Sequence, residues 1–111
     1  MKIKVETVNN VTVIYVEGDI FAEDAERMKD AFENLFINNK TKVILCLDKT
    51  DIISSVGLGV ILSSLIKFRK YRGNIVLCGV KDFVRKILKT TKVDTILESY
   101  VSLEAALDAV K

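Results

Sequence analysis

The sequence predicts an α/β fold with a mixed β-sheet, formed by an N-terminal hairpin plus parallel strands, and about four α-helices packed against it. Two short apolar runs, at residues 43–47 and 75–78, are typical of strands covered on both faces, and a helical pattern lies between them. Residues 2–17 are instead rich in β-branched side chains, as expected of a hairpin. With 111 residues the chain has the size of one domain, and we expect residues 1–111 to fold as a single unit.

The predicted hairpin pairs residues 2–8 with residues 11–17. The second segment, Val-Thr-Val-Ile-Tyr-Val-Glu, carries the β-branched and aromatic side chains that strands favour. Asn9-Asn10 between the two segments is a turn pair suited to positive φ, and Gly18-Asp19 ends the second strand.

An amphipathic helix is predicted over residues 22–37. Acidic residues crowd its first turn, where the helix dipole favours negative charge, and Asn38-Asn39 ends it. Its apolar positions recur at helical spacing, at Ala25, Met28, Phe32, Leu35 and Phe36.

The next three elements form a predicted βαβ unit, with strands at 43–47 and 75–78 and a helix at 56–72. We expect the two strands to be parallel, because a crossover helix joins parallel neighbours. Gly73 suits the C′ position that ends the helix. One face of this helix is apolar, at Leu58, Ile61, Leu62, Leu65 and Phe68.

The last part of the chain is predicted to hold a short helix at residues 82–90, a short strand at 95–98 and a final helix. Ser102 is a suitable N-cap for the final helix. The apolar face of that helix is formed by Leu103, Ala106, Leu107 and Val110.

Composition excludes several classes of function. Seventeen basic and fifteen acidic residues leave a net charge of +2, which is too small to favour nucleic acid as a direct partner. The chain has no histidine, which excludes His-based triads and most zinc sites, and we expect no catalytic residue, metal or cofactor. Cys46 and Cys78 lie within apolar runs, so we expect buried free thiols. The absence of a signal core and of an apolar stretch of about 18 residues predicts a cytoplasmic protein with no membrane partner.

Residues 48–59 are the strongest candidate for a functional segment. They join a buried strand to a long helix and emerge at the carboxyl edge of the sheet, where α/β proteins usually place their sites. Ser54 or Ser55 can cap the helix, and Gly57 and Gly59 reduce the side-chain cover so that another backbone or a phosphate can approach. In a simpler interpretation, one serine only caps the helix and the glycines only allow close packing. The full spacing of a P-loop, of a dinucleotide-binding motif or of a nucleophile elbow is missing.

This segment also carries a resemblance to a known family. The resemblance rests on the run Ile53-Ser54-Ser55-Val56-Gly57-Leu58-Gly59-Val60 and on the hairpin end Gly18-Asp19-Ile20. Together they resemble the anti-sigma-factor antagonists of the STAS domain family, whose pattern in this loop is Asp-Ser-Ser/Thr-Gly-Leu-Gly. Length and element order extend the resemblance over essentially the whole chain. Two positions depart from the family: Ser54 replaces the aspartate of the pattern, and Phe21 stands where the first loop often has a second acidic residue.

The resemblance implies a bacterial partner-switching protein that is not an enzyme. In its unphosphorylated form such a protein binds an anti-sigma factor that is also a serine kinase, and so releases the sigma factor. The kinase phosphorylates the first serine of the pattern, which matches Ser55, and a metal-dependent serine phosphatase removes the phosphate. The partner contacts expected around Ser55 are Asp19, Ser54, Gly57, Leu58 and Ile61.

Other functions fit parts of the sequence. In the main alternative, the same helix N-terminus holds a nucleotide or another anion, as in a small STAS-type sensor module, and a catalytic role ranks third. Asp48 at a strand end resembles the phospho-accepting aspartate of response receivers, but their acidic cluster is missing. The basic residues between 67 and 89 are explained more simply as a solvated face than as a nucleic-acid or membrane patch.

Overall fold

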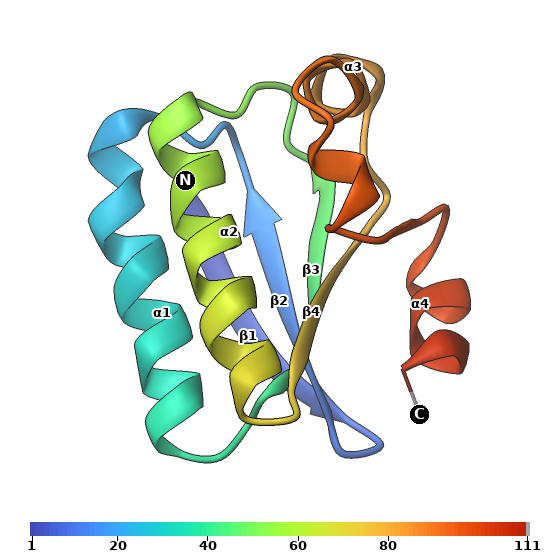
Figure 1. The fold of residues 1–111 in the computed structure, drawn as a ribbon. Coiled ribbons are helices and arrows are strands. Elements are labelled where there is room, and N and C mark those ends of the chain that lie inside the picture. The colour runs from blue at the N-terminus through green and yellow to red at the C-terminus, as the bar shows by residue number, and fades with distance from the viewer. Residues whose placement is uncertain (111) are drawn as a thin grey trace.

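The computed structural model describes residues 1–110, which form one five-stranded mixed sheet with the strand order β1-β2-β3-β4-β5 (Figure 1). β1 is antiparallel to β2, and every other pair of neighbouring strands is parallel. The predicted fold class and element order are therefore confirmed. The strands are β1 Lys2–Val8, β2 Val11–Glu17, β3 Lys42–Lys49, β4 Asn74–Cys78 and β5 Ser99–Tyr100. The helices are α1 Ala25–Ile37, α2 Ser55–Lys70, α3 Asp82–Thr90 and α4 Leu103–Ala109.

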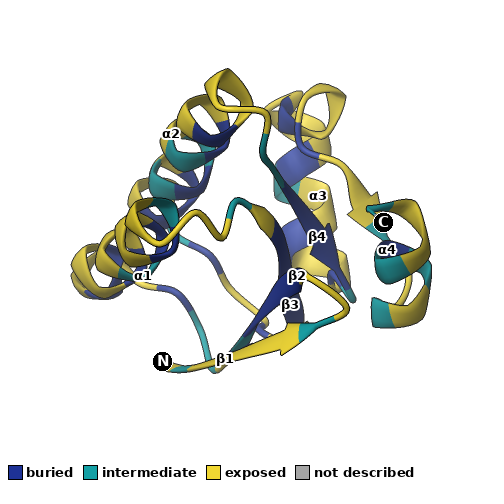
Figure 2. Ribbon diagram, turned by 90° about the horizontal axis from the view of Figure 1, so that it is seen from below, coloured by how far each residue is buried: buried dark blue, intermediate teal, exposed yellow. Residues whose placement is uncertain are grey.

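The helices are divided unequally between the two faces of the sheet. α1, α2 and α3 pack on one face, and α4 covers part of the other (Figure 1). Because β3 and β4 are covered on both sides, most of their residues are buried, as Figure 2 shows. The larger core, under α1 to α3, includes Ile14, Phe32, Leu45, Leu65, Phe68 and Leu77. The smaller core, under α4, consists of Val11, Val13, Ile44, Cys46, Val76, Cys78 and Ala106. Both cysteines are buried free thiols, as predicted.

The predicted hairpin turn is confirmed. β1 and β2 pair from Lys2 opposite Glu17 to Val8 opposite Val11, which leaves Asn9-Asn10 as a two-residue loop. The two asparagines have φ values of 51° and 69°. Positive φ at both central residues is the requirement of a type I′ turn, whose twist matches that of the paired strands.

α1 begins three residues later than predicted. Ala22–Asp24 forms a 3-10 turn, and the Asp24 carboxylate accepts a hydrogen bond of 2.8 Å from the Phe21 N–H group. The α-helix then runs from Ala25 to Ile37. It ends at the predicted asparagine pair, where Asn39 has a φ of 61°.

Gly73 does not occupy the predicted C′ position of α2. The helix ends at Lys70, and the left-handed residue after it is Arg72, with a φ of 66°. A Cβ atom at Gly73 would lie 2.4 Å from the carbonyl oxygen of Thr41. Glycine is therefore needed here because another segment of backbone approaches closely, and not because of its own φ.

The last strand lies later than predicted, at Ser99–Tyr100 and not at residues 95–98. Lys92 takes a φ of 61° after α3, and Val93–Thr95 forms a 3-10 turn. Val93 and Leu97 are buried in the larger core. With these side chains turned into the core, residue pairing with β4 begins only at Ser99.

α4 begins as predicted, with Ser102 as its N-cap. The Ser102 hydroxyl accepts a hydrogen bond of 3.1 Å from the Ala105 N–H group. Across residues 1–110, none of the helices combines the length and the apolar character needed to cross a membrane.

Candidate functional site

Two loops meet at the carboxyl ends of β2 and β3. Three backbone hydrogen bonds join them, from Gly18 N–H to Lys49 C=O at 3.0 Å, from Ile20 N–H to Ile52 C=O at 2.9 Å and from Ser54 N–H to Ile20 C=O at 2.8 Å. The pairing of the two strands therefore continues beyond the sheet. It holds the segment that leads into α2 in one conformation.

Asp19, in the loop after β2, binds the backbone of the loop after β3. One oxygen of its half-buried carboxylate accepts hydrogen bonds from the N–H groups of Asp51 and Ile52, both at 3.0 Å. The hydroxyl of the fully buried Thr50 donates to the Gly18 carbonyl oxygen at 3.0 Å. Because hydrogen bonds to a charged acceptor are stronger than those to a neutral one, Asp19 positions the loop through its backbone.

The two serines, which the sequence left as alternative caps, have different surroundings. The Ser54 hydroxyl accepts a hydrogen bond of 3.0 Å from the Gly57 N–H group and is the N-cap of α2. Ser55 is the first residue of the helix and is exposed to solvent. Ser55 is therefore the serine that is open to a modifying enzyme, whereas the Ser54 hydroxyl is engaged with the backbone.

The two glycines of α2 also differ. A Cβ atom at Gly57 would lie 2.6 Å from Cγ2 of Ile20, a fully buried side chain, so Gly57 lets the first turn of the helix lie against the first loop. A Cβ atom at Gly59 would meet nothing within 4 Å. The close-packing interpretation of the sequence is therefore correct for Gly57, and Gly59 has no steric reason to be glycine.

Three of the expected partner contacts lie beneath the site and not on its surface. Gly57 is buried, the side chain of Leu58 is 7% exposed and that of Ile61 is 0% exposed. Leu58 and Ile61 belong to the larger core, because they lie on the helix face that packs against the sheet. Their burial leaves these three residues little surface to offer a partner, and their role as partner contacts stays a prediction.

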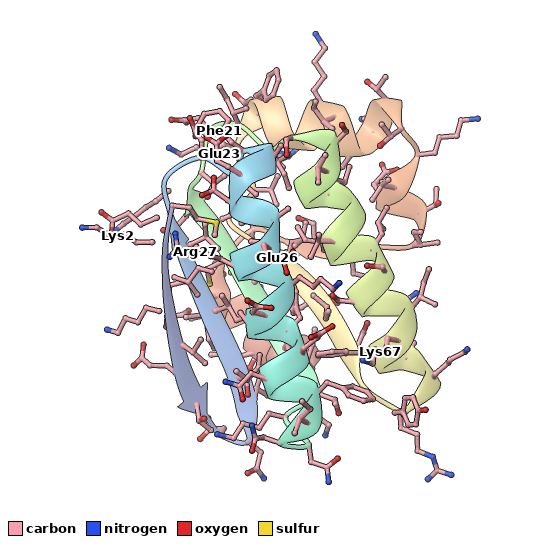
Figure 3. All side chains as sticks on the ribbon, turned by 90° about the vertical axis from the view of Figure 1, so that its left-hand side faces the viewer. Lys2, Phe21, Glu23, Glu26, Arg27 and Lys67 are labelled. Atoms are coloured by element: carbon pink, nitrogen blue, oxygen red, sulfur yellow. The ribbon has the colours of Figure 1, made fainter. Side chains whose placement is uncertain are left out.

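Sequence reasoning missed the apolar side chains that are exposed around Ser55. Phe21 is 45% exposed, Ile52 is 42% exposed and Val56 is 51% exposed. They come from the two hydrogen-bonded loops and from the first turn of α2, and Figure 3 shows Phe21 at the same end of the molecule as the start of α2. The helical phase of Val56, which lies off the apolar stripe of α2, was the signal that could have identified one of them.

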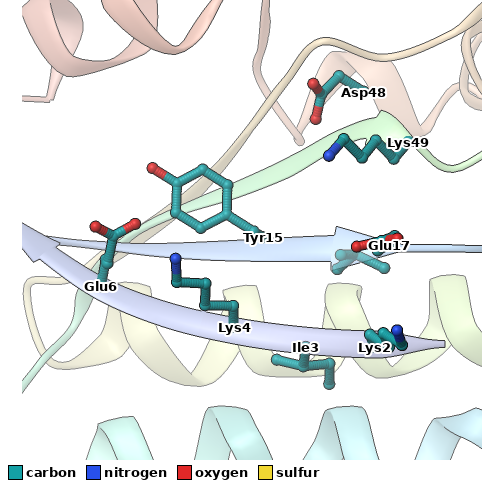
Figure 4. Close-up of a pocket in the computed structure, with 9 residues that line it drawn as sticks. Lys2, Ile3, Lys4, Glu6, Tyr15, Glu17, Asp48 and Lys49 are labelled. Carbon is teal, nitrogen blue, oxygen red and sulfur yellow. The ribbon is translucent and has the colours of Figure 1, made fainter.

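Asp48 does not belong to this site. It lines a hollow of about 700 Å³ on the sheet face that α4 leaves open, and both acidic and basic side chains line this hollow (Figure 4). Burial and the neighbouring Glu6 raise the pKa of the Tyr15 hydroxyl in the same hollow. The lining residues are Lys2, Ile3, Lys4, Glu6, Tyr15, Val16, Glu17, Asp48 and Lys49.

The rim of the site carries one ion pair. The Lys81 ammonium lies 3.1 Å from the Asp51 carboxylate, and both side chains are largely exposed, so the pair contributes little to stability. Within residues 1–110, no three side chains of the types that bind metal ions come together. The site is therefore an exposed serine with exposed apolar side chains on the two loops and the first turn of α2, which backbone hydrogen bonds join.

Comparison with known proteins assigns this arrangement to a family. The model of the STAS domain matches residues 2–106, and the chain belongs to the STAS domain family. It is 30% identical to the anti-sigma-B factor antagonist of Listeria monocytogenes, over 77% of this chain and 75% of that protein. The resemblance inferred from the loop residues is therefore confirmed.

Two solved structures show the same fold. The crystal structure of an anti-sigma factor antagonist from Mycobacterium paratuberculosis has a TM-score of 0.90 and 23% identity, covering 98% of this chain and 92% of that chain. The Bacillus cell fate determinant SpoIIAA in its phosphorylated form has a TM-score of 0.78 and 18% identity, covering 99% of this chain and 100% of that chain.

Proposed function

We propose that this chain is an anti-sigma factor antagonist that works by partner switching. In its unphosphorylated form it binds an anti-sigma factor that is also a serine kinase, and the bound kinase then releases its sigma factor. Phosphorylation of Ser55 ends the binding, and a serine phosphatase restores it. The observation that carries the proposal is the exposed Ser55 at the start of α2, on a loop held in place by Asp19.

The surface around Ser55 favours a protein partner. Phe21, Ile52 and Val56 are each about half exposed, and large apolar side chains gathered around a polar group are typical of protein interaction sites. The family membership and the name of the Listeria relative support an anti-sigma factor as that partner.

A phosphate on Ser55 is compatible with the fold. It would add about −1.5 to −2 charges, and an anion at a helix N-terminus is stabilised by roughly 0.3 to 1 kcal/mol. The first turn of α2 contains no acidic residue that would repel it. The phosphate therefore acts on the partner: it places a charge in the apolar surface that the kinase would cover, where it must lose its hydration.

A small anion or nucleotide is a poorer fit to the same residues. The Ser54 hydroxyl already engages the Gly57 N–H group, one of the donors that an anion would need. The neighbouring side chains of Phe21 and Val56 are apolar. The hollow of Figure 4 lies on another face and does not include either serine.

Phosphate mapping with the kinase tests the proposal. The chain is incubated with ATP and the anti-sigma factor kinase of the same organism, and its intact mass is measured. We expect the gain of one acid-stable phosphate, located at Ser55 by peptide mapping.

Two variants serve as a matched pair in this experiment. Ser55→Ala should gain no phosphate, whereas Ser54→Ala, which loses only the cap, should gain it at Ser55. A phosphate found on Ser54, Ser63 or Ser64 would remove the switch from Ser55, and an acid-labile phosphate would indicate Asp48 instead.

A further inference from the structure

The sheet face under α4 carries a second pair of reactive groups, remote from Ser55. Cys46 on β3 and Cys78 on β4 are direct partners in the parallel register, and their Sγ atoms are 2.9 Å apart. Neighbouring strands lie about 4.8 Å apart, so the Cα atoms of partner residues fall within the roughly 4.4–6.8 Å that a disulfide spans. A bond between the two sulfur atoms therefore requires little movement of the backbone.

The two thiols lie in a row of four side chains that crosses the sheet. Tyr15 pairs with Cys46, Cys46 with Cys78, and Cys78 with Tyr100. The cysteines are 4% and 3% exposed, and the tyrosine at each end of the row is half buried. Ala106 of α4 belongs to the same apolar cluster. At one end of the row, Tyr15 lines the hollow of Figure 4.

We propose that Cys46 and Cys78 form a reversible intramolecular disulfide when the protein meets a peroxide. In the first step the thiolate of one cysteine attacks one oxygen of hydrogen peroxide, the O–O bond breaks, and the departing hydroxide takes up a proton to leave as water. That cysteine is then a sulfenic acid. In the second step the sulfur of the other cysteine attacks the sulfenic sulfur, the S–O bond breaks, and the hydroxide leaves as water with the proton of the attacking thiol. Two thiols have then lost two electrons and two protons, and the peroxide has been reduced to two waters.

The contact between the sulfur atoms places the two thiols in position for this reaction. One thiol donates a hydrogen bond to the other sulfur atom, and either cysteine can be the donor. The hydrogen bond stabilises the thiolate of the sulfur atom that accepts it. The thiolate is the nucleophile in such chemistry, so the accepting cysteine attacks the peroxide and the donating cysteine resolves the sulfenic acid.

The disulfide would link β3 to β4 across 32 positions of sequence, a segment that contains the loop before α2 and α2 itself. Closing a loop of this length restricts the unfolded chain, and we expect the melting temperature to rise by about 5–10 °C. The modification does not depend on the proposed function of Ser55.

The test uses the reduced full-length chain in its folded state. The chain is treated with hydrogen peroxide, the peroxide is removed with catalase, and the mass and free thiols are measured after unfolding. We expect a monomer that is lighter by two hydrogen atoms, has no free thiol and yields a linked peptide containing Cys46 and Cys78. Dithiothreitol should restore both thiols.

Two single variants separate the steps. Cys46→Ala and Cys78→Ala should each stop at a sulfenic acid that dimedone traps, because each variant lacks the second thiol that completes the disulfide. The proposal is overturned if the folded wild-type chain keeps both thiols at a peroxide dose that oxidises the urea-unfolded chain. It is also overturned if wild type gains oxygen without the internal link, or forms links only between molecules.

Discussion

On one face of the sheet three helices bury large side chains such as Phe32 and Phe68, whereas on the other the short α4 covers small ones such as Val13 and Cys46. The face under α1, α2 and α3, called the thick face below, anchors the functional loops, because Ile20 and Ile53 belong to its core. The face under α4, called the thin face below, has a hollow beside α4 and buries the two thiols under this single short helix. The molecule thus supports the loop of Ser55 from its larger core and holds the cysteine pair in its smaller one.

The anchoring is visible in the way the loops enter the thick core. Ile20 and Ile53 form a parallel bridge between the two loops, and both side chains are buried. Ser55 follows Ile53 by two residues, so its position is determined by the core and not by the sequence of the loop alone. Substitutions in the thick face should therefore lower the free energy of unfolding more than substitutions in the thin face do. Substitutions in the loops should have effects between these two.

The largest effect is expected from Phe68→Ala in the thick face. Phe68 is fully buried and packs edge-on against Phe32, with ring centroids 6.1 Å apart. Removing a buried aromatic ring costs about 3–5 kcal/mol, and urea denaturation followed by circular dichroism measures the loss. Ile66→Ala, on the exposed side of the same helix, is the control and should change stability by less than about 0.5 kcal/mol. Equal losses in the two variants would show that the thick face is not the main core.

The two glycines of α2 provide a matched pair for the contact between loop and helix. Gly57→Ala places a Cβ atom against Ile20 and should cost about 1–3 kcal/mol. Gly59→Ala meets no neighbouring atom and should stabilise the chain by up to about 1 kcal/mol, because alanine favours helix more than glycine does. Both values come from denaturant midpoints, and an equal gain in the two variants would refute the close contact with Ile20.

Asp19→Ala should loosen the loop while leaving the core intact. The change removes two hydrogen bonds from backbone N–H groups to a half-buried carboxylate. We expect the free energy of unfolding to fall by about 1–2 kcal/mol. Hydrogen exchange should become faster at the Asp51 and Ile52 amides and stay unchanged in β4. Asp19→Asn keeps an acceptor oxygen and should lose less stability. If both amides stayed protected from exchange in Asp19→Ala, the positioning role of Asp19 would be contradicted.

The smallest effect is expected at the thin face, from Ser102→Ala. The variant loses the N-cap of α4, which is worth about 1 kcal/mol. Because α4 covers Cys46 and Cys78, their reaction with a thiol reagent in the folded state should become faster. Glu104→Ala, at an exposed position in the first turn, serves as the control. Unchanged thiol reactivity in Ser102→Ala would mean that α4 does not control access to the pair.

Features encoded by neighbouring residues could be predicted from the sequence. The turn at Asn9-Asn10, the Ser102 cap and the bounds of α3 depend on local conformation alone. Gly73 was misinterpreted, because the Thr41 carbonyl that crowds it comes from a distant segment of the chain. The last strand was misplaced for a similar reason, since the burial of Leu97 decides where pairing with β4 can start.

The candidate site also combines features that the local sequence predicts with features that depend on distant segments of the chain. The exposed position of Ser55 follows from the strand-to-helix junction, but the choice of Ser54 as the cap required the structure. Leu58 and Ile61 share the apolar stripe that predicted the helix, and that stripe implies burial rather than contact with a partner. The closeness of Cys46 and Cys78 depends on the register of two strands, which a single sequence does not reveal.

The most direct test of the central claim is the affinity of position-55 variants for the anti-sigma factor kinase, measured by calorimetry. A carboxylate in a surface built for a neutral hydroxyl must be desolvated without a partner, which typically costs about 2–5 kcal/mol. Ser55→Asp should therefore bind at least about 30-fold more weakly than wild type. Ser55→Ala should bind nearly as well as wild type, because it loses only a small exposed hydroxyl. Equal affinities for serine, alanine and aspartate at position 55 would contradict the account.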